Sequence, residues 1–190
     1  RIKMDRQKAI EILNEYLHTD HLVKHCYAVE AVMMALARRL APDKEDEWGI
    51  AGLLHDLDAD MVDYRTFPEQ HGPKAVEILR SINFGNEEMY HAILAHNQAT
   101  GTEIKNSFDR ALYAADPITG FITAIALVYP DKKLSSVKVK SITKRMNELR
   151  FAAGADRDAM RSIEKLGIPF AEFAELSLKA MTEIADVLGL

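Results

Sequence analysis

The side chains best suited to chemistry lie in one short run, residues 51–60, which reads A-G-L-L-H-D-L-D-A-D. His55 and Asp56 are adjacent there, and neighbouring side chains on a helix point about 100° apart, so both can reach one object. The apolar residues around the pair recur at helical spacing, which predicts that the pair is buried. A buried carboxylate needs a partner, and imidazole and carboxylate are both ordinary ligands of divalent metal ions. The pair therefore indicates a metal site, unless Asp56 simply hydrogen-bonds to His55 at a helix end.

Two further ionisable residues lie on apolar helical faces. His25 follows Leu22 by one turn, and Asp116 interrupts a long apolar run just before Pro117. With the His-Asp pair they would supply two imidazoles and two carboxylates, a set that suits Fe, Mn, Ni or Zn and leaves positions for water and substrate. Each residue also has a structural interpretation, because a core histidine can bond to a backbone carbonyl and an aspartate before proline can cap a helix.

The pattern of apolar residues predicts that helices position these side chains. No segment alternates in the manner of a strand, so we expect an all-α fold, a single-domain helical bundle. The turns and breakers leave loops at 57–70 and 98–105, and Pro117 should kink or divide the helix that contains it. The expected helices are 5–17, 22–40, one that starts at 43 or 46 and ends at the His-Asp pair, one that starts at 71–73, then 87–97, 108–129, 157–166 and 169–188.

The composition is that of an ordinary globular domain. The chain has 190 residues, of which 48% are hydrophobic and 28% charged, so residues 5–190 are expected to form one domain with a substantial core. The net charge of −5 argues against a general nucleic-acid binder. Cys26 is the only cysteine, which excludes an intramolecular disulfide and fits the cytoplasm.

The sequence also predicts that the protein has no membrane partner. We find no apolar run that approaches the roughly 18 residues of a membrane span. The first residues, Arg1 to Met4, lack the apolar stretch of a signal peptide.

The order and spacing of the candidate ligands resemble those of the HD (HDIG) superfamily of metal-dependent phosphohydrolases. The resemblance covers about residues 20–121 and rests on A-G-L-L-H-D, on L-Y-A-A-D and on the order H…HD…D. It implies a helical metal-binding core over that range, with C-terminal helices at about 132–190 packed on it. It also implies hydrolysis of phosphate esters or anhydrides, often in nucleotides, with His55 and Asp56 as catalytic residues. The residues that match the pattern are His25, His55, Asp56 and Asp116.

Two more histidines extend the resemblance. His71 in Q-H-G-P-K-A-V-E-I-L and His96 in A-I-L-A-H-N are similar to the third and fourth histidines of binuclear HD enzymes. This similarity implies a second ion, held by His71, His96 and a bridging Asp56, so the expected cofactor is one or two ions of Fe, Mn, Ni, Co or Zn. His71 also suits a helix start, and His91 competes with His96.

One departure from the family concerns the phosphate contact. Many relatives continue H-D-I-G-K, with a lysine three residues after the aspartate, where this chain has Ala59. The C-terminal basic stretch, residues 132–150, could supply a substitute or could be a solvated helix face. The substrate-binding candidates are Arg65, Lys74, Lys144, Arg145 and Arg157.

The predicted function is hydrolysis of a small phosphate-containing substrate by metal-activated water. A nucleotide or related small molecule is expected, and the HD-type diadenosine-tetraphosphate hydrolases are similar in size and histidine pattern. Two alternatives stay open: a non-catalytic sensor that binds a metal or nucleotide, and an HD-type di-iron oxygenase that cleaves a C–P or C–C bond. The pattern assigns no separate general base and no oligomeric state.

Overall fold

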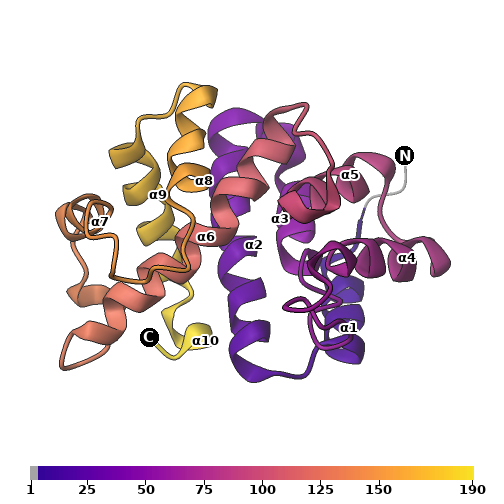
Figure 1. Ribbon diagram of the computed structural model, residues 1–190, viewed down its shortest axis with the longest axis horizontal. Helices are drawn as coiled ribbons and strands as arrows, with labels where there is room; N and C mark the ends of the chain where they lie inside the picture. Colours follow the sequence, from indigo (N-terminus) through magenta and orange to yellow (C-terminus); the bar gives the residue numbers. More distant parts are fainter. Residues whose placement is uncertain (1–3) are drawn as a thin grey trace.

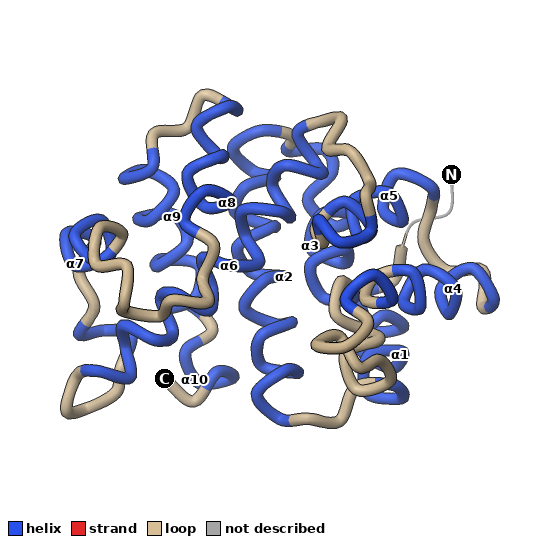
Figure 2. Tube along the Cα trace, viewed as in Figure 1, coloured by secondary structure: helices blue, strands red, loops and turns tan. Residues whose placement is uncertain are grey.

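The structure, a computed structural model, describes residues 4–190, and every regular element within that range is a helix (Figure 2). The all-α prediction is therefore confirmed. The sequence analysis also interpreted Arg1 to Met4 as lacking a signal peptide, and Arg1 to Lys3 lie outside the described part of the chain.

Two long helices, α2 and α6, cross at the centre of the molecule (Figure 1). In the view of Figure 1, α1, α3, α4 and α5 lie to the right of α2, and α7 to α10 lie to its left. Buried hydrophobic side chains from Ala9 to Leu188 form one continuous core. The helices are α1 (Arg6–Tyr16), α2 (Asp20–Leu40), α3 (Glu45–Leu54), α4 (Pro73–Ser81), α5 (Glu87–Ala95), α6 (Ser107–Val128), α7 (Val139–Arg145), α8 (Arg157–Arg161), α9 (Phe170–Glu183) and α10 (Ala185–Leu188).

The contact between α2 and α3 is the most extensive one between helices, and it depends on a glycine. A Cβ atom at Gly52 would lie 2.9 Å from the carbonyl oxygen of Val29 and 3.0 Å from the backbone nitrogen of Glu30. These atoms belong to the backbone of α2 and cannot turn aside. Gly52 therefore lets the end of α3, which carries His55, approach the helix that carries His25.

The apolar helix α6 excludes one of the two outcomes expected at Pro117, division of the helix, and it corrects the expectation about apolar length. Pro117 lies inside it without dividing it, since α6 is one helix of 22 residues. Among the described residues α6 is also the one helix that is long and apolar enough to span a bilayer, contrary to the expectation that no apolar run approaches this length. However, 61% of its most apolar window is buried by the rest of the fold. Its composition is that of a central core helix.

The last expected helix is divided in two. α9 ends at Glu183 and α10 begins at Ala185, with Ile184 between them at φ −116° and ψ 26°. Gly189 stops α10 in the left-handed region at φ +70°, as expected for a C-terminal glycine. Beyond it, the carbonyl oxygen of Leu190 accepts a hydrogen bond of 2.8 Å from the backbone of Leu134, which ties the end of the chain to the α6–α7 connection.

We predict that Gly52→Ala destabilises the protein by about 1–3 kcal/mol, because the added methyl group forces α2 and α3 apart. Gly120 is a matched control, since it also lies within a helix but has no atom within 4 Å of a Cβ added there. Gly120→Ala should stabilise the protein by about 0.5–1 kcal/mol, as expected for replacing a helical glycine. Urea denaturation measures both effects, and equal stabilisation by the two changes would contradict the close contact.

Candidate metal centre

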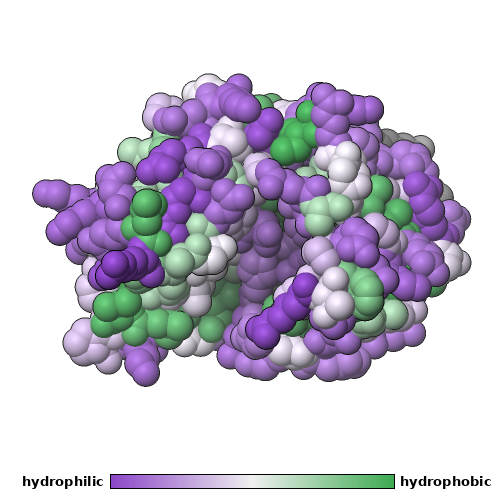
Figure 3. Space-filling view, viewed as in Figure 1, coloured by the Kyte–Doolittle hydropathy of each residue, from purple (hydrophilic) through white to green (hydrophobic). Residues whose placement is uncertain are grey.

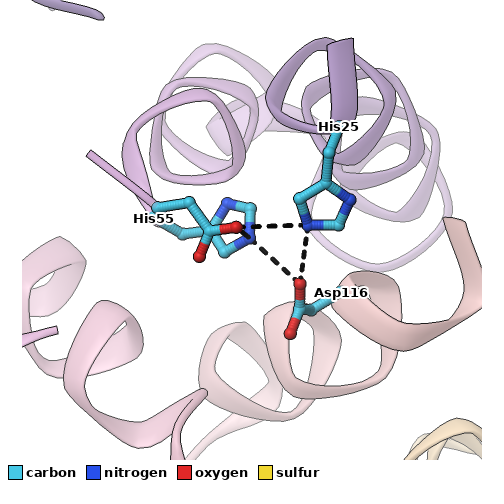
Figure 4. Close-up of side chains that lie close together, drawn as sticks. His25, His55 and Asp116 are labelled. Atoms are coloured by element: carbon cyan, nitrogen blue, oxygen red, sulfur yellow. Dashed lines mark hydrogen bonds and ion pairs between the residues drawn. The ribbon is translucent and has the colours of Figure 1, made fainter. Parts of the chain in front are cut away.

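The structure brings all six predicted ligand residues into one cluster, although they come from different parts of the fold. Two of them directly follow α3, and the others come from α2, from the turn before α4, from the residue after α5 and from α6. Figure 4 shows His25 on α2 and Asp116 on α6 pointing toward His55. The six residues are His25, His55, Asp56, His71, His96 and Asp116.

The first group of ligand atoms surrounds the Asp116 carboxylate. Its Oδ1 atom lies 2.8 Å from Nε2 of His25 and 3.1 Å from Nε2 of His55. Oδ2 of Asp56 lies 3.4 Å from each of these nitrogens. Two imidazoles and two carboxylates thus face one point from two helices, α2 and α6, and from the two residues that follow α3. This group could hold a metal ion.

The second group uses the other oxygen of Asp56. Oδ1 lies 3.0 Å from Nε2 of His71 and 3.7 Å from Nε2 of His96, and these two nitrogens are 3.3 Å apart. The second group could also hold an ion. Because the two oxygens of Asp56 are divided between the groups, this carboxylate stands in the position of a bridge.

Two of the histidines are oriented by the helix ends on which they lie. Nδ1 of His55 lies 2.6 Å from the carbonyl oxygen of Gly52, and Nδ1 of His96 contacts the carbonyl oxygen of Ile93. A carbonyl only accepts hydrogen bonds, so Nδ1 carries the proton in both rings. The Nε2 atom is left to face the carboxylates, which is the usual arrangement in metal-binding histidines.

Side-chain oxygens orient the other two histidines, and neither partner was among the predicted site residues. Oδ1 of Asp58 lies 2.6 Å from Nδ1 of His71. Oγ1 of Thr119 lies 3.2 Å from Nδ1 of His25 and donates its own proton to the carbonyl oxygen of Asp116. Nε2 therefore faces the cluster in all four rings. The donor set fits a metal ion because each nitrogen that faces the carboxylates is the one left free to ligate.

Asp58 also builds the turn that carries His71. It is fully buried, and its Oδ2 atom accepts hydrogen bonds from the backbone of Gly72 at 2.7 Å and of Ala75 at 3.0 Å. Two residues further on, Asp60 accepts from the hydroxyl of Thr19 at 2.6 Å and so fixes this segment to the start of α2. The signal in the sequence was the D-x-D-x-D spacing from residue 56 onward, in a segment without helical period.

The close approach of imidazoles and carboxylates shifts the pKa values of several residues in the cluster. Burial by itself would lower the pKa of His55 and of His71, but the adjacent carboxylates outweigh it and raise these values to about 9 and about 10. For His55 the carboxylates are Asp56 and Asp116, and for His71 they are Asp56 and Asp58. Burial would likewise raise the pKa of Asp56 and of Asp116, but the neighbouring histidines outweigh it and hold both well below the usual range. Without an ion, His55 and His71 are therefore imidazolium groups that face ionised carboxylates.

The comparison with known families agrees with this geometry. The sequence model of the HD domain matches residues 22–126, which is more than half of the chain and contains all six cluster residues. The chain belongs to the HD-domain family. Comparison with curated proteins and with solved structures returned no match.

Of the two histidines that competed for one position in this HD-domain protein, only His96 reaches the cluster. His91 points away from it and pairs with the buried Asp109, with Nδ1 and Oδ2 2.8 Å apart.

A cavity of about 660 Å³ opens over the cluster of the HD-domain protein. Its lining includes His25, Asp56, His71 and Asp116, and also Ala59, at the position where many relatives have lysine. Figure 3 shows a hollow near the centre of the molecule, with hydrophilic surface at its floor. Its volume is in the range of small-molecule sites in proteins.

None of the five basic residues expected to contact substrate is among those that line this cavity. Arg157 is buried and donates hydrogen bonds to the carbonyl oxygens of Glu148, Phe151, Ala152 and Ala155, so its guanidinium supports a loop. Arg145 pairs with Glu148 at 3.1 Å, Lys74 pairs with Glu77 at 3.4 Å, and Arg65 and Lys144 are exposed. The one lysine or arginine in the lining is Lys24, which precedes His25 on α2.

We predict that Asp58→Asn lowers the metal content of the protein without unfolding it. An asparagine side chain has one oxygen where Asp58 has two, and its NH₂ group cannot accept a hydrogen bond. The variant therefore loses either the hydrogen bonds from the backbone of Gly72 and Ala75 or the hydrogen bond from His71. Loss of such an outer partner typically weakens metal binding about 10–100-fold. If both groups hold ions, elemental analysis should show about one ion per chain in place of two. Asp63→Asn, on an exposed part of the same segment, is the control, and equal metal content in both variants would contradict this role.

The raised pKa values predict that metal binding releases protons. His55 and His71 are protonated in metal-stripped protein below about pH 9 and about pH 10, and an imidazole must lose this proton to ligate through Nε2. Affinity should therefore rise with pH from 7 to 9, by up to about tenfold per unit for each proton displaced. Calorimetric titration with metal in two buffers of different ionisation enthalpy counts these protons. Binding without proton release at pH 7 would show that the carboxylates do not hold the rings protonated.

Proposed function

We propose that this HD-domain protein is a metal-dependent phosphohydrolase that acts on an ester or anhydride of a small phosphorylated molecule. The observation that carries the proposal is the position of Asp56, whose two oxygens face two separate groups of imidazole nitrogens. A carboxylate placed in this way can bridge two ions, which is the arrangement of many enzymes that displace a group from phosphorus.

In this proposal the first ion is held by His25, His55, Asp56 and Asp116, and the second by Asp56, His71 and His96. A bound divalent ion supplies Lewis acidity, which lowers the pKa of a water molecule and polarises a phosphoryl oxygen. Asp58, Thr119 and the carbonyls of Gly52 and Ile93 keep the imidazole rings in the tautomer that can ligate.

The cavity gives a small molecule access to the carboxylates of this cluster. Asp56 and Asp116 are both part of its lining, so a phosphoryl group that enters it can reach the proposed ions. The open access and the complete ligand set favour an enzyme over a non-catalytic sensor, since a sensor would not need both groups. No feature of the residues that the structure describes favours the oxygenase alternative.

The test is a screen of phosphatase activity with defined metals. Protein stripped with chelator is reloaded with Mn, Fe, Co, Ni or Zn and assayed against nucleotides, dinucleoside polyphosphates and sugar phosphates. We expect turnover with at least one metal. His55→Ala and Asp56→Ala should remove bound metal and lower kcat/KM by more than the roughly 100-fold typical of outer-shell changes, while circular dichroism shows a helical fold.

His18→Gln is the control, because His18 is exposed and lies outside both groups. It should keep the wild-type metal content and activity. No turnover with any metal, or full metal content in His55→Ala, would overturn the proposal.

A further inference from the structure

The cavity over the cluster has two chemically different ends. The ligand residues form its floor, whereas much of the remaining lining is apolar. The polar side chains in that part are Asp20, His21, Lys24 and Thr123, and Thr123 already donates its hydroxyl to the carbonyl oxygen of Thr119 at 2.8 Å. Figure 3 shows hydrophobic surface on the side of the hollow over the end of α6 and α10. The apolar side chains of the lining include Leu22, Tyr64, Leu127, Leu188 and Leu190.

Three of these five apolar residues lie in a part of the chain that the HD match does not cover. The match ends at residue 126, and Leu127, Leu188 and Leu190 all follow it. The wall is held in place by the hydrogen bond from Leu134 to the carbonyl oxygen of Leu190 and by that from Leu190 to Ala185 at 3.1 Å. Leu188 is 6% exposed and packs into the core, whereas Leu127 is 49% exposed. A large exposed leucine in the wall of a cavity beside the cluster offers a surface that a ligand can cover.

Lys24 brings positive charge to the same space. Its ammonium group lies beside Gly189, where α2 and α10 approach each other. Its one described ion-pair partner is Asp20, at 3.0 Å, and the Asp20 side chain is 84% exposed. Exposed pairs of this kind contribute little, so a lysine is readily diverted to an anionic ligand.

We infer that the cavity selects phosphorylated compounds that carry an apolar organic group. The phosphoryl group lies over the cluster, in the cavity that Lys24 also lines, and the apolar group packs against Leu127 and Leu190. This inference deepens the proposed function and rests on it for the position of the phosphoryl group. The family core would then supply the metal cluster, and the C-terminal segment would determine which ester is accepted.

The experiment measures equilibrium binding of two stable phosphonates to the metal-loaded protein by calorimetry. Phenylphosphonate and methylphosphonate share the anionic group and differ in apolar surface. We expect phenylphosphonate to bind at least about tenfold more tightly, in line with the gain from filling an apolar site. Leu127→Asn should remove most of this preference. Val128→Asn is the matched control, because Val128 is exposed on the next position of α6 and is not part of the lining.

The contribution of the Lys24 ammonium group is tested in the same binding assay. Lys24→Gln should weaken both phosphonates by a similar factor, about threefold to tenfold, while Lys74→Gln, outside the lining, should change neither. Equal binding of the two phosphonates by the wild type, or an unchanged preference in Leu127→Asn, would overturn the apolar selection. Unchanged binding in Lys24→Gln would overturn the placement of the phosphoryl group near this residue.

The outcomes separate this inference from the proposed function. Hydrolysis of phenyl phosphate and of ribose 5-phosphate is followed in parallel with binding. Turnover of both esters at equal rates, with no preference among the phosphonates, would overturn the inference and leave the hydrolase intact. A clear phosphonate preference that Leu127→Asn removes, in a protein that hydrolyses no ester with any metal, would support the ligand class and refute the hydrolase.

Discussion

The burial of the Asp56 carboxylate is the constraint on which the rest of the site depends. A carboxylate removed from water is unstable unless charges or hydrogen bonds surround it, and here imidazole nitrogens face both of its oxygens. Meeting this need requires side chains from α2, from the ends of α3 and α5, from the start of α4 and from α6. The close packing of these helices, including the contact that Gly52 permits, is therefore part of the chemistry.

A second layer of oxygens decides what the cluster can bind. Each ring is held through Nδ1 by a backbone carbonyl, by Asp58 or by Thr119, so all four present the same nitrogen. Asp58 has two roles, because it orients His71 and also accepts a hydrogen bond from the backbone of the turn that carries His71. The segment between α3 and α4, which lacks helical period, thus gains its shape from carboxylates that follow the His-Asp pair.

The metal cluster lies within the HD region, whereas part of the cavity wall lies outside it. The HD region contains the cluster, and the helices that follow it close one side of the cavity with apolar side chains and carry few groups that could read a polar ligand. The basic residues expected to contact phosphate form other contacts or face solvent, and Arg157 donates hydrogen bonds to five backbone carbonyls. Lys24, which is adjacent to a ligand in sequence, is the cation that reaches the cavity.

Periodicity and motif by themselves determined the helical class, the approximate helices and the six residues of the cluster, because local propensity and the H…HD…H…H…D order are properties of the chain. They also singled out Ala59 as a departure from the family. Only the tertiary structure paired His91 with Asp109, gave Asp58 and Thr119 their partners, and placed Lys24, Leu127 and Leu190 around one cavity. These contacts join residues that are far apart in the chain, such as Lys24 and Leu190, which are 166 positions apart. Helix packing sets that distance, and no local pattern encodes it.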